Sequence, residues 1–297
     1  MDSLRTSDGI ALHLRRWNAT TADSRGLVLI VHGLGEHIGR YDAVAQTLAA
    51  LGWQVLGYDQ RGHGRSEGAR GDIAHADSLY LDLASVIDHA REQTRGQTRD
   101  QTRDNAPRKL VLLGHSMGGL VAARFVAEGL AAQPSPWSRA VDALVLSSPA
   151  LELGMNAAQR LALKVLGKAA PHLAVSNGLK ARWISRDAAV VRAYEQDALV
   201  HDRITPALVR CMLDGGEFVR SRAAFWRVPT LLLWAGADRC VDPDGSALFV
   251  AAAPTALLTA QVFPELFHEI FNEPERDEVL ARLSSWLASS WQATQSP

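Results

Sequence analysis

Cysteine is scarce in this 297-residue chain, which contains only Cys211 and Cys240. Neither thiol belongs to a Cys-x-x-Cys pair or to a cysteine and histidine spacing typical of zinc sites. The sequence therefore argues against a disulfide-stapled scaffold and a structural metal, and free thiols fit a reducing compartment. We expect neither a metal nor a cofactor.

An excess of charge of one sign is also absent, because 31 lysine and arginine residues nearly balance 32 aspartate and glutamate residues. Such a balance gives no broad field to attract nucleic acid or an anionic membrane as the main partner. The chain also lacks an apolar signal core near its start and any uninterrupted apolar run of about 18 residues. From these absences we expect a soluble cytoplasmic protein that does not bind nucleic acid.

Hydrophobic residues are plentiful and make up 47% of the chain, enough to bury one large core. Short apolar runs alternate with segments of helical period, which predicts a mainly parallel sheet with helices on both faces. The predicted strands are 10–17, 27–31, 54–58, 110–113, 143–147, 230–234 and 258–263. The predicted helices of the main pattern are 41–51, 78–90, 120–131 and 275–287.

One departure from this alternation is the segment 93–104, which repeats Gln-Thr-Arg three times at a period of four. Its arginine and aspartate residues are compatible with a helix extended by salt-bridged turns. A solvated loop or frayed helix end without function is the other interpretation.

A second departure is the segment 152–226, which is far longer than an ordinary connection and has helical patterning of its own. Asn156 is placed to cap the first of these helices. We predict that 1–151 and 227–297 form the core, and that 152–226 is a helical cap over the carboxyl edge of the sheet, where such sheets bind ligands. A packing subdomain far from any pocket is the alternative.

The pentapeptide Gly-His-Ser-Met-Gly at 114–118 lies between a predicted strand and a predicted helix. In that context G-x-S-x-G is typical of a nucleophile turn. Such a turn forces the backbone of Ser116 into a strained conformation, and side chains at the two glycine positions would collide with the neighbouring strand and helix. The helix directs its first amides to the same place, so the N–H of Met117 can stabilise an oxyanion. A merely structural turn is the alternative.

A serine nucleophile needs a base and a carboxylate that orients the base, and in this type of fold the carboxylate precedes the histidine. Asp238 and His268 each follow one of the last two predicted strands. We therefore predict a triad of Ser116, Asp238 and His268. Asp242 and Asp244 are rivals for the carboxylate, although both lie deeper in the loop.

The loop 32–41, which reads HGLGEHIGRY, follows an early strand. A loop in this place supplies the second oxyanion donor, here the N–H of Leu34, and two such amides contribute on the order of several kcal/mol. We expect His32 to brace the loop and the charged groups of 58–68 to act as scaffold. The alternative is an ordinary strand-to-helix turn, whose glycines serve only its backbone conformation.

With these motifs in place, the chain resembles serine hydrolases of the α/β-hydrolase fold, and more narrowly the monoacylglycerol lipase and lysophospholipase branch. The resemblance covers nearly the whole chain through HGLGEHIGRY, YDQRGHGRSEG, LGHSMGG, GADRCVDP and FHEIFNEP, in the order of that branch. It implies an eight-stranded, mainly parallel sheet with a helical cap. It also implies that Glu36 and Arg40 help to bind a glycerol head group. The alternative for Arg40 is a structural role, in which the fold's own carboxylates hold its side chain. This chain departs from the mammalian members at one position: it has Phe271 where they have a second histidine.

The resemblance implies a monoacylglycerol lipase that cleaves single-chain acyl glycerols through an acyl-enzyme on Ser116. Apolar helices in the cap favour an acyl chain and offer a face for transient contact with a lipid surface. A lysophospholipase, a carboxylesterase, an aminopeptidase and a hydrolase-like binding protein remain alternatives, whereas a serine at the turn disfavours haloalkane dehalogenase chemistry. Cys240 is either a target for thiol reagents close to the site or a buried, inert thiol.

Overall fold

A computed structural model describes residues 2–21, 24–97 and 109–292 of the chain. Within these residues, eight strands form one sheet whose central and later strands are parallel, as predicted. The strands, in spatial order, are β1 (Ser3–Arg5), β2 (Ala11–Trp17), β4 (Gln54–Tyr58), β3 (Leu27–Val31), β5 (Leu110–His115), β6 (Ala143–Ser147), β9 (Thr230–Ala235) and β10 (Leu258–Phe263). β2 pairs antiparallel with both β1 and β4 at one edge.

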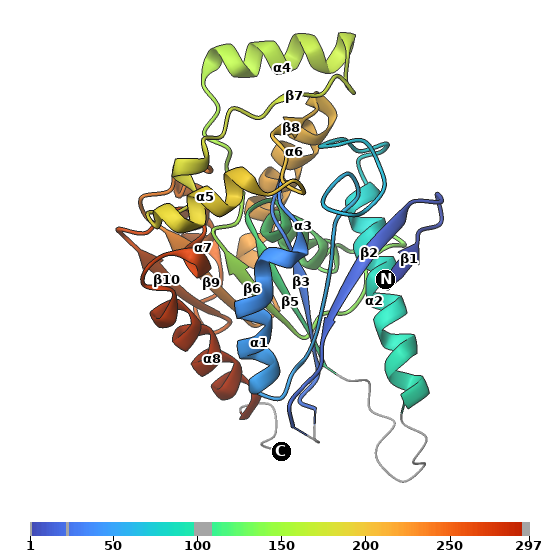
Figure 1. Cartoon of the computed structure of the whole chain (residues 1–297), viewed down its shortest axis with the longest axis vertical. Coiled ribbons are helices and arrows are strands. Elements are labelled where there is room, and N and C mark those ends of the chain that lie inside the picture. The colour runs from blue at the N-terminus through green and yellow to red at the C-terminus, as the bar shows by residue number, and fades with distance from the viewer. Residues whose placement is uncertain (1, 22–23, 98–108, 293–297) are drawn as a thin grey trace.

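The central strands are apolar on both faces because helices cover both faces of the sheet (Figure 1). α1 (Asp42–Ala50) and α8 (Arg276–Gln292) share one apolar core with the sheet. α2 (Ser78–Gln97), α3 (Ser116–Glu128) and α7 (Asp244–Ala252) share the other core. Each fully buried Leu, Ile or Val contributes about 1.5–3 kcal/mol, so these two cores fix the positions of the strand ends.

The sequence did not predict β1, and it ended the helix before the Gln-Thr-Arg repeat too early. β1 is short and mostly exposed at the sheet edge, so it has little apolar signal. α2 continues through Gln97, which makes the beginning of the repeat helical. The remainder, residues 98–104, lies outside the described residues.

Between β6 and β9 the chain forms a set of helices and one short ribbon. These elements are α4 (Ala157–Ala169), β7 (Val175–Ser176), α5 (Ala188–Gln196), β8 (Arg203–Ile204) and α6 (Pro206–Arg222). The predicted cap of the first helix is confirmed, because the side chain of Asn156 accepts a hydrogen bond from the N–H of Gln159. α6 packs its apolar face against α3, whereas α4 has no buried residue and lies at the far end of the molecule (Figure 1).

None of the helices in the described ranges combines the length and the apolar character needed to cross a membrane.

Candidate active site

Ser116 stands at the turn from β5 to α3 in a strained backbone conformation with φ of 53°. The glycines on either side leave room for this turn. A Cβ added at Gly118 would lie 2.1 Å from the carbonyl oxygen of Val31, and one at Gly114 would lie 2.5 Å from that of Gly118. The predicted strain and the predicted collisions are therefore both confirmed.

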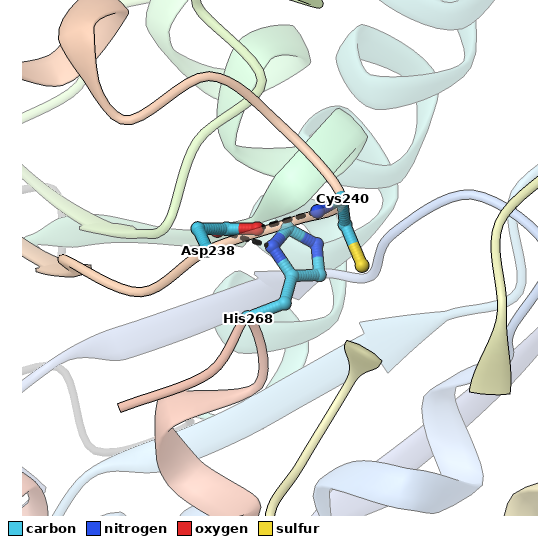
Figure 2. A group of neighbouring side chains, drawn as sticks. All are labelled: Asp238, Cys240 and His268. Carbon is cyan, nitrogen blue, oxygen red and sulfur yellow. Dashed lines mark hydrogen bonds and ion pairs between the residues drawn. The ribbon is translucent and has the colours of Figure 1, made fainter. Parts of the chain in front are cut away.

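Asp238 and His268 follow β9 and β10 and form a hydrogen-bonded pair (Figure 2). The ring N–H at Nδ1 of His268 donates to Oδ2 of Asp238 over 2.7 Å. The other oxygen, Oδ1, accepts from the backbone N–H groups of Cys240 at 2.8 Å and Val241 at 3.2 Å. The Asp238 side chain is only 1% exposed, so these three donors and the fold hold it in one orientation.

The charges of this pair shift both pKa values. Burial favours the neutral carboxyl of Asp238, but the attraction to His268 and the hydrogen bonds to its oxygens outweigh burial and lower its pKa. Burial likewise disfavours a charged imidazole, yet the carboxylate of Asp238 raises the pKa of His268 above its ordinary value of 6.5. The arrangement therefore stabilises an imidazolium next to an ionised carboxylate.

Ser116, His268 and Leu34 line a single cavity of about 330 Å³. Residues between positions 177 and 202, which belong to the long segment after β6, also line this cavity. Met117 is fully buried behind Ser116 at the start of α3.

The rival carboxylates lie elsewhere in the loop. Asp242 accepts a hydrogen bond from the N–H of Asp244, which is the first residue of α7. Of the three carboxylates weighed from the sequence, Asp238 is the one that the structure joins to His268.

The loop after β3 presses against the serine. A Cβ added at Gly33 would lie 3.1 Å from Cβ of Ser116, so the backbone of this loop passes directly beside it. His32 braces the loop as expected: its Nδ1–H donates to the carbonyl of Gly33 at 2.7 Å, and its Nε2 accepts from the N–H of Gln60 at 2.9 Å. Burial lowers the pKa of His32, in keeping with this neutral form.

The strand-exit loop 58–68 acts as scaffold, as expected. The carboxylate of Asp59 accepts from the backbone N–H groups of Ile38 and Arg65, each at 2.8 Å. Arg61 donates twice to the buried carboxylate of Asp82 at 2.6 Å. These contacts tie the loop to its neighbours and satisfy the charges of Asp59 and Arg61.

Arg40 is paired with two carboxylates of the protein, as expected if its role is structural. Its guanidinium donates to Glu36 at 2.9 Å and twice to Glu269, at 2.5 and 2.7 Å. Glu36 also accepts from the N–H of Gly33 at 2.6 Å and from the hydroxyl of Tyr41 at 2.7 Å. Burial opposes ionisation of Glu36, but Arg40 and its other polar neighbours lower its pKa to about 2. Contact of Glu36 or Arg40 with a substrate head group stays a prediction.

Replacing Arg40 with methionine is expected to lower the free energy of unfolding by about 3–5 kcal/mol, because two buried carboxylates lose their cation. Urea unfolding measures this loss. Arg5→Met is a suitable control, since Arg5 and Glu67 are exposed and 3.9 Å apart, and its effect should stay below about 1 kcal/mol. Equal effects of the two substitutions would contradict the structural role of Arg40.

Cys240 lies close to the site, as the sequence suggested. One ligand atom from each of Asp238, Cys240 and His268 lies within 4.8 Å of the other two (Figure 2). Burial and the carboxylate of Asp238 raise the pKa of the Cys240 thiol, which favours the inert interpretation over reaction with thiol reagents. Sequence spacing could not reveal that these three side chains lie together, because Asp238 and Cys240 follow β9 whereas His268 follows β10.

The strand order, the strained serine at the β5 turn and the carboxylate and histidine after the last strands define an α/β-hydrolase. A family model described as "Serine aminopeptidase, S33" matches residues 22–275. The chain belongs to this family of serine hydrolases, as its motifs implied.

Relatives within this family are similar over almost their whole length. A monoacylglycerol lipase of Mycolicibacterium smegmatis is 36% identical over 95% of this chain and 94% of its own length. Phospholipase YtpA of Bacillus subtilis is 32% identical over 85% of this chain and 91% of its own. The crystal structure of Paleococcus ferrophilus monoacylglycerol lipase matches with a TM-score of 0.77 and 33% identity, covering 94% of this chain and 98% of that one.

Proposed function

We propose that this chain is a serine ester hydrolase that cleaves monoacylglycerols. The observation that carries this proposal is the strained Ser116 on the wall of the cavity that also contains His268, which Asp238 orients. The monoacylglycerol lipases among its relatives support the substrate class.

In the proposed reaction, Oγ of Ser116 attacks the ester carbonyl while Nε2 of His268 takes its proton. The N–H groups of Leu34 and Met117 stabilise the oxyanion, and Asp238 stabilises the imidazolium. The imidazolium then protonates the departing glycerol oxygen. Water, deprotonated by the same histidine, releases the fatty acid and restores the serine.

This mechanism predicts the pH dependence of kcat/KM. Because His268 must be neutral to accept the serine proton, activity should be low at acid pH and rise as pH passes the pKa of His268. Asp238 raises that pKa, so the midpoint of the rising limb should lie above 6.5. A profile measured on a p-nitrophenyl ester, with circular dichroism to verify folding at each pH, checks this. A midpoint below the ordinary value would contradict the proposed pairing.

The cavity wall has both parts that a monoacylglycerol requires. Leu34, Leu179 and Ile184 provide apolar surface for an acyl chain, and polar groups such as Asn177 and Lys180 suit hydroxyl groups of glycerol. In this proposal, residues 152–226 form the cap and the remainder forms the core. Both cysteines are free thiols, which supports the expected cytoplasmic location.

A second candidate is the hydrolysis of aminoacyl substrates. Such substrates carry a free amine that needs an acidic partner, and the carboxylates of Glu195 and Asp202 line the same cavity. The sequence alone did not place an acidic group there.

A substrate panel separates these candidates. It compares 1-monoacylglycerols of increasing chain length with lysophosphatidylcholine and an aminoacyl-naphthylamide. We expect kcat/KM to be highest for the monoacylglycerols and to rise about fourfold for each methylene that becomes buried, since each contributes about 0.8 kcal/mol. A preference for the lysophospholipid or the amide would overturn the proposed substrate class.

Contact with a lipid surface through α4 is part of the proposal. Leu161 and Val165 lie one turn apart on this helix and are 63% and 57% exposed, and lysines 164 and 168 flank them. An apolar face bordered by cations is typical of helices that lie in a membrane interface.

The double substitution Leu161→Asp and Val165→Asp is therefore expected to reduce binding to phosphatidylcholine vesicles at least about tenfold, because two apolar side chains no longer enter the lipid. Co-sedimentation measures binding, and turnover of a water-soluble ester verifies the fold. Leu248→Asp on α7 is the control, since Leu248 is 59% exposed but lies outside α4. Unchanged binding of the double variant would rule out α4 as the contact.

A further inference from the structure

Cys240 has a side chain that the proposed reaction does not use, although it lies beside two side chains that the reaction does use. Its sulfur and the Asp238 carboxylate lie on either side of the His268 ring (Figure 2). Within the described part of the chain, this is the one group of three or more His, Cys, Asp or Glu side chains close enough to hold a metal ion.

The three side chains are of the types that zinc prefers in proteins. Zinc bonds to thiolate sulfur at about 2.3 Å and to imidazole nitrogen at about 2.0–2.1 Å, which separates neighbouring ligand atoms by about 3.5 Å in a tetrahedral site. One ligand atom from each of the three residues already lies within 4.8 Å of the other two, so the group is close to the spacing that a bound ion requires. Cys240 and His268 also line the cavity, which gives an ion a route to them.

The existing hydrogen bonds determine which atoms are free to bind. His268 uses its Nδ1–H to donate to Asp238, so the lone pair of the neutral ring is on Nε2. A histidine that binds zinc through one nitrogen typically donates the other N–H to a carboxylate, which is the arrangement present here. The N–H of Cys240 donates to Asp238 as well, so the residue that supplies the sulfur is held on the same turn as the orienting carboxylate.

We propose that the thiolate of Cys240 and Nε2 of His268, with Asp238 orienting the imidazole, bind a soft divalent cation of the zinc class, and that this binding blocks ester hydrolysis. Burial and Asp238 oppose ionisation of the free thiol, so the charge of the arriving cation must displace its proton to solvent as the metal–sulfur bond forms. The metal also takes the Nε2 lone pair. Water fills the remaining coordination positions. In the reaction this Nε2 lone pair must accept the proton of Ser116. A bound cation and ester hydrolysis therefore exclude each other. The inhibition rests on the proposed function, whereas the binding does not.

The first experiment measures binding without substrate. Titration with Co²⁺ replaces Zn²⁺ by a coloured ion, and a thiolate-to-cobalt charge-transfer band in the near ultraviolet reports sulfur coordination. We expect the band in the wild type and in Cys211→Ser, and its loss in Cys240→Ser. Cys211 is the matched control because it is the other thiol, buried beside Tyr80 and the carbonyl of Ala76. Absence of the band in the wild type, or its persistence in Cys240→Ser, would overturn the site.

The second experiment measures inhibition of p-nitrophenyl ester hydrolysis by Zn²⁺, with each variant compared with its own activity in the presence of a chelator. Loss of the sulfur ligand in Cys240→Ser is expected to raise the half-inhibitory zinc concentration at least about tenfold, whereas Cys211→Ser should match the wild type. Equal inhibition of wild type and Cys240→Ser would overturn the inhibitory role. A cobalt band in a protein without ester hydrolysis would preserve the site and contradict the proposed function, so the two failures are distinguishable.

Discussion

Replacing Ser116 with alanine is expected to reduce kcat/KM on monoacylglycerols and p-nitrophenyl esters by at least about 10⁴-fold, because no acyl-enzyme can form. The oxyanion donors and the cavity remain, so weak background catalysis and substrate binding should persist. The protein should stay folded, since alanine only removes the hydroxyl and leaves the glycines that accommodate the turn.

Ser85→Ala is a control for this experiment, because Ser85 lies half-buried on α2 and its hydroxyl donates within the helix, to the carbonyl of Leu81. Its turnover should equal that of the wild type. Thermal unfolding of both variants distinguishes loss of chemistry from loss of fold. Wild-type turnover in Ser116→Ala would remove this serine as the nucleophile.

Replacing Asp238 with asparagine is the second large expected effect, a fall in kcat/KM of about 10⁴-fold. Asp238 accepts hydrogen bonds on both oxygens, from His268 on one and from the N–H groups of Cys240 and Val241 on the other. An asparagine has a single acceptor oxygen. If that oxygen takes the two backbone donors, its NH₂ group faces Nδ1 of His268. The ring must then carry its proton on Nε2, where it cannot accept the proton of Ser116.

Asp242→Asn and Asp244→Asn are the matched controls, because these carboxylates are the rivals for the same role. Asp242 accepts from the N–H of Asp244 at the start of α7, and neither is joined to His268. Steady-state kinetics on all three variants should show a large loss for Asp238→Asn alone. A comparable loss in Asp242→Asn with near-normal activity in Asp238→Asn would reassign the orienting carboxylate.

The sequence was sufficient to predict the sheet because its central strands are apolar on both faces, a pattern that few other folds produce. It also led to the pairing of Asp238 with His268. Parallel strands bring their carboxyl ends to one edge, so residues that follow β9 and β10 meet without any long-range information.

Contacts between side chains distant in sequence could not be predicted in the same way. Arg40 and Glu269 are 229 positions apart, and a charged residue in a loop carries no signal of its partner. The Cys240 group depends in the same way on the convergence of two loops.

The helix α4 illustrates a further limit. Its apolar spacing predicted an amphipathic helix correctly, but periodicity does not say what covers the apolar face. In the structure Leu161 and Val165 are exposed, whereas the similar face of α6 is buried against α3.

The central claim is that Ser116 is the nucleophile of an ester hydrolase, and labelling with a fluorophosphonate probe tests it most directly. The probe forms a covalent bond only with a serine that its neighbours activate. Mass spectrometry of the labelled protein and its peptides should reveal one adduct, on Ser116, with loss of ester hydrolysis in proportion to labelling. An adduct on a different residue, or an active enzyme that the probe does not label, would contradict the account.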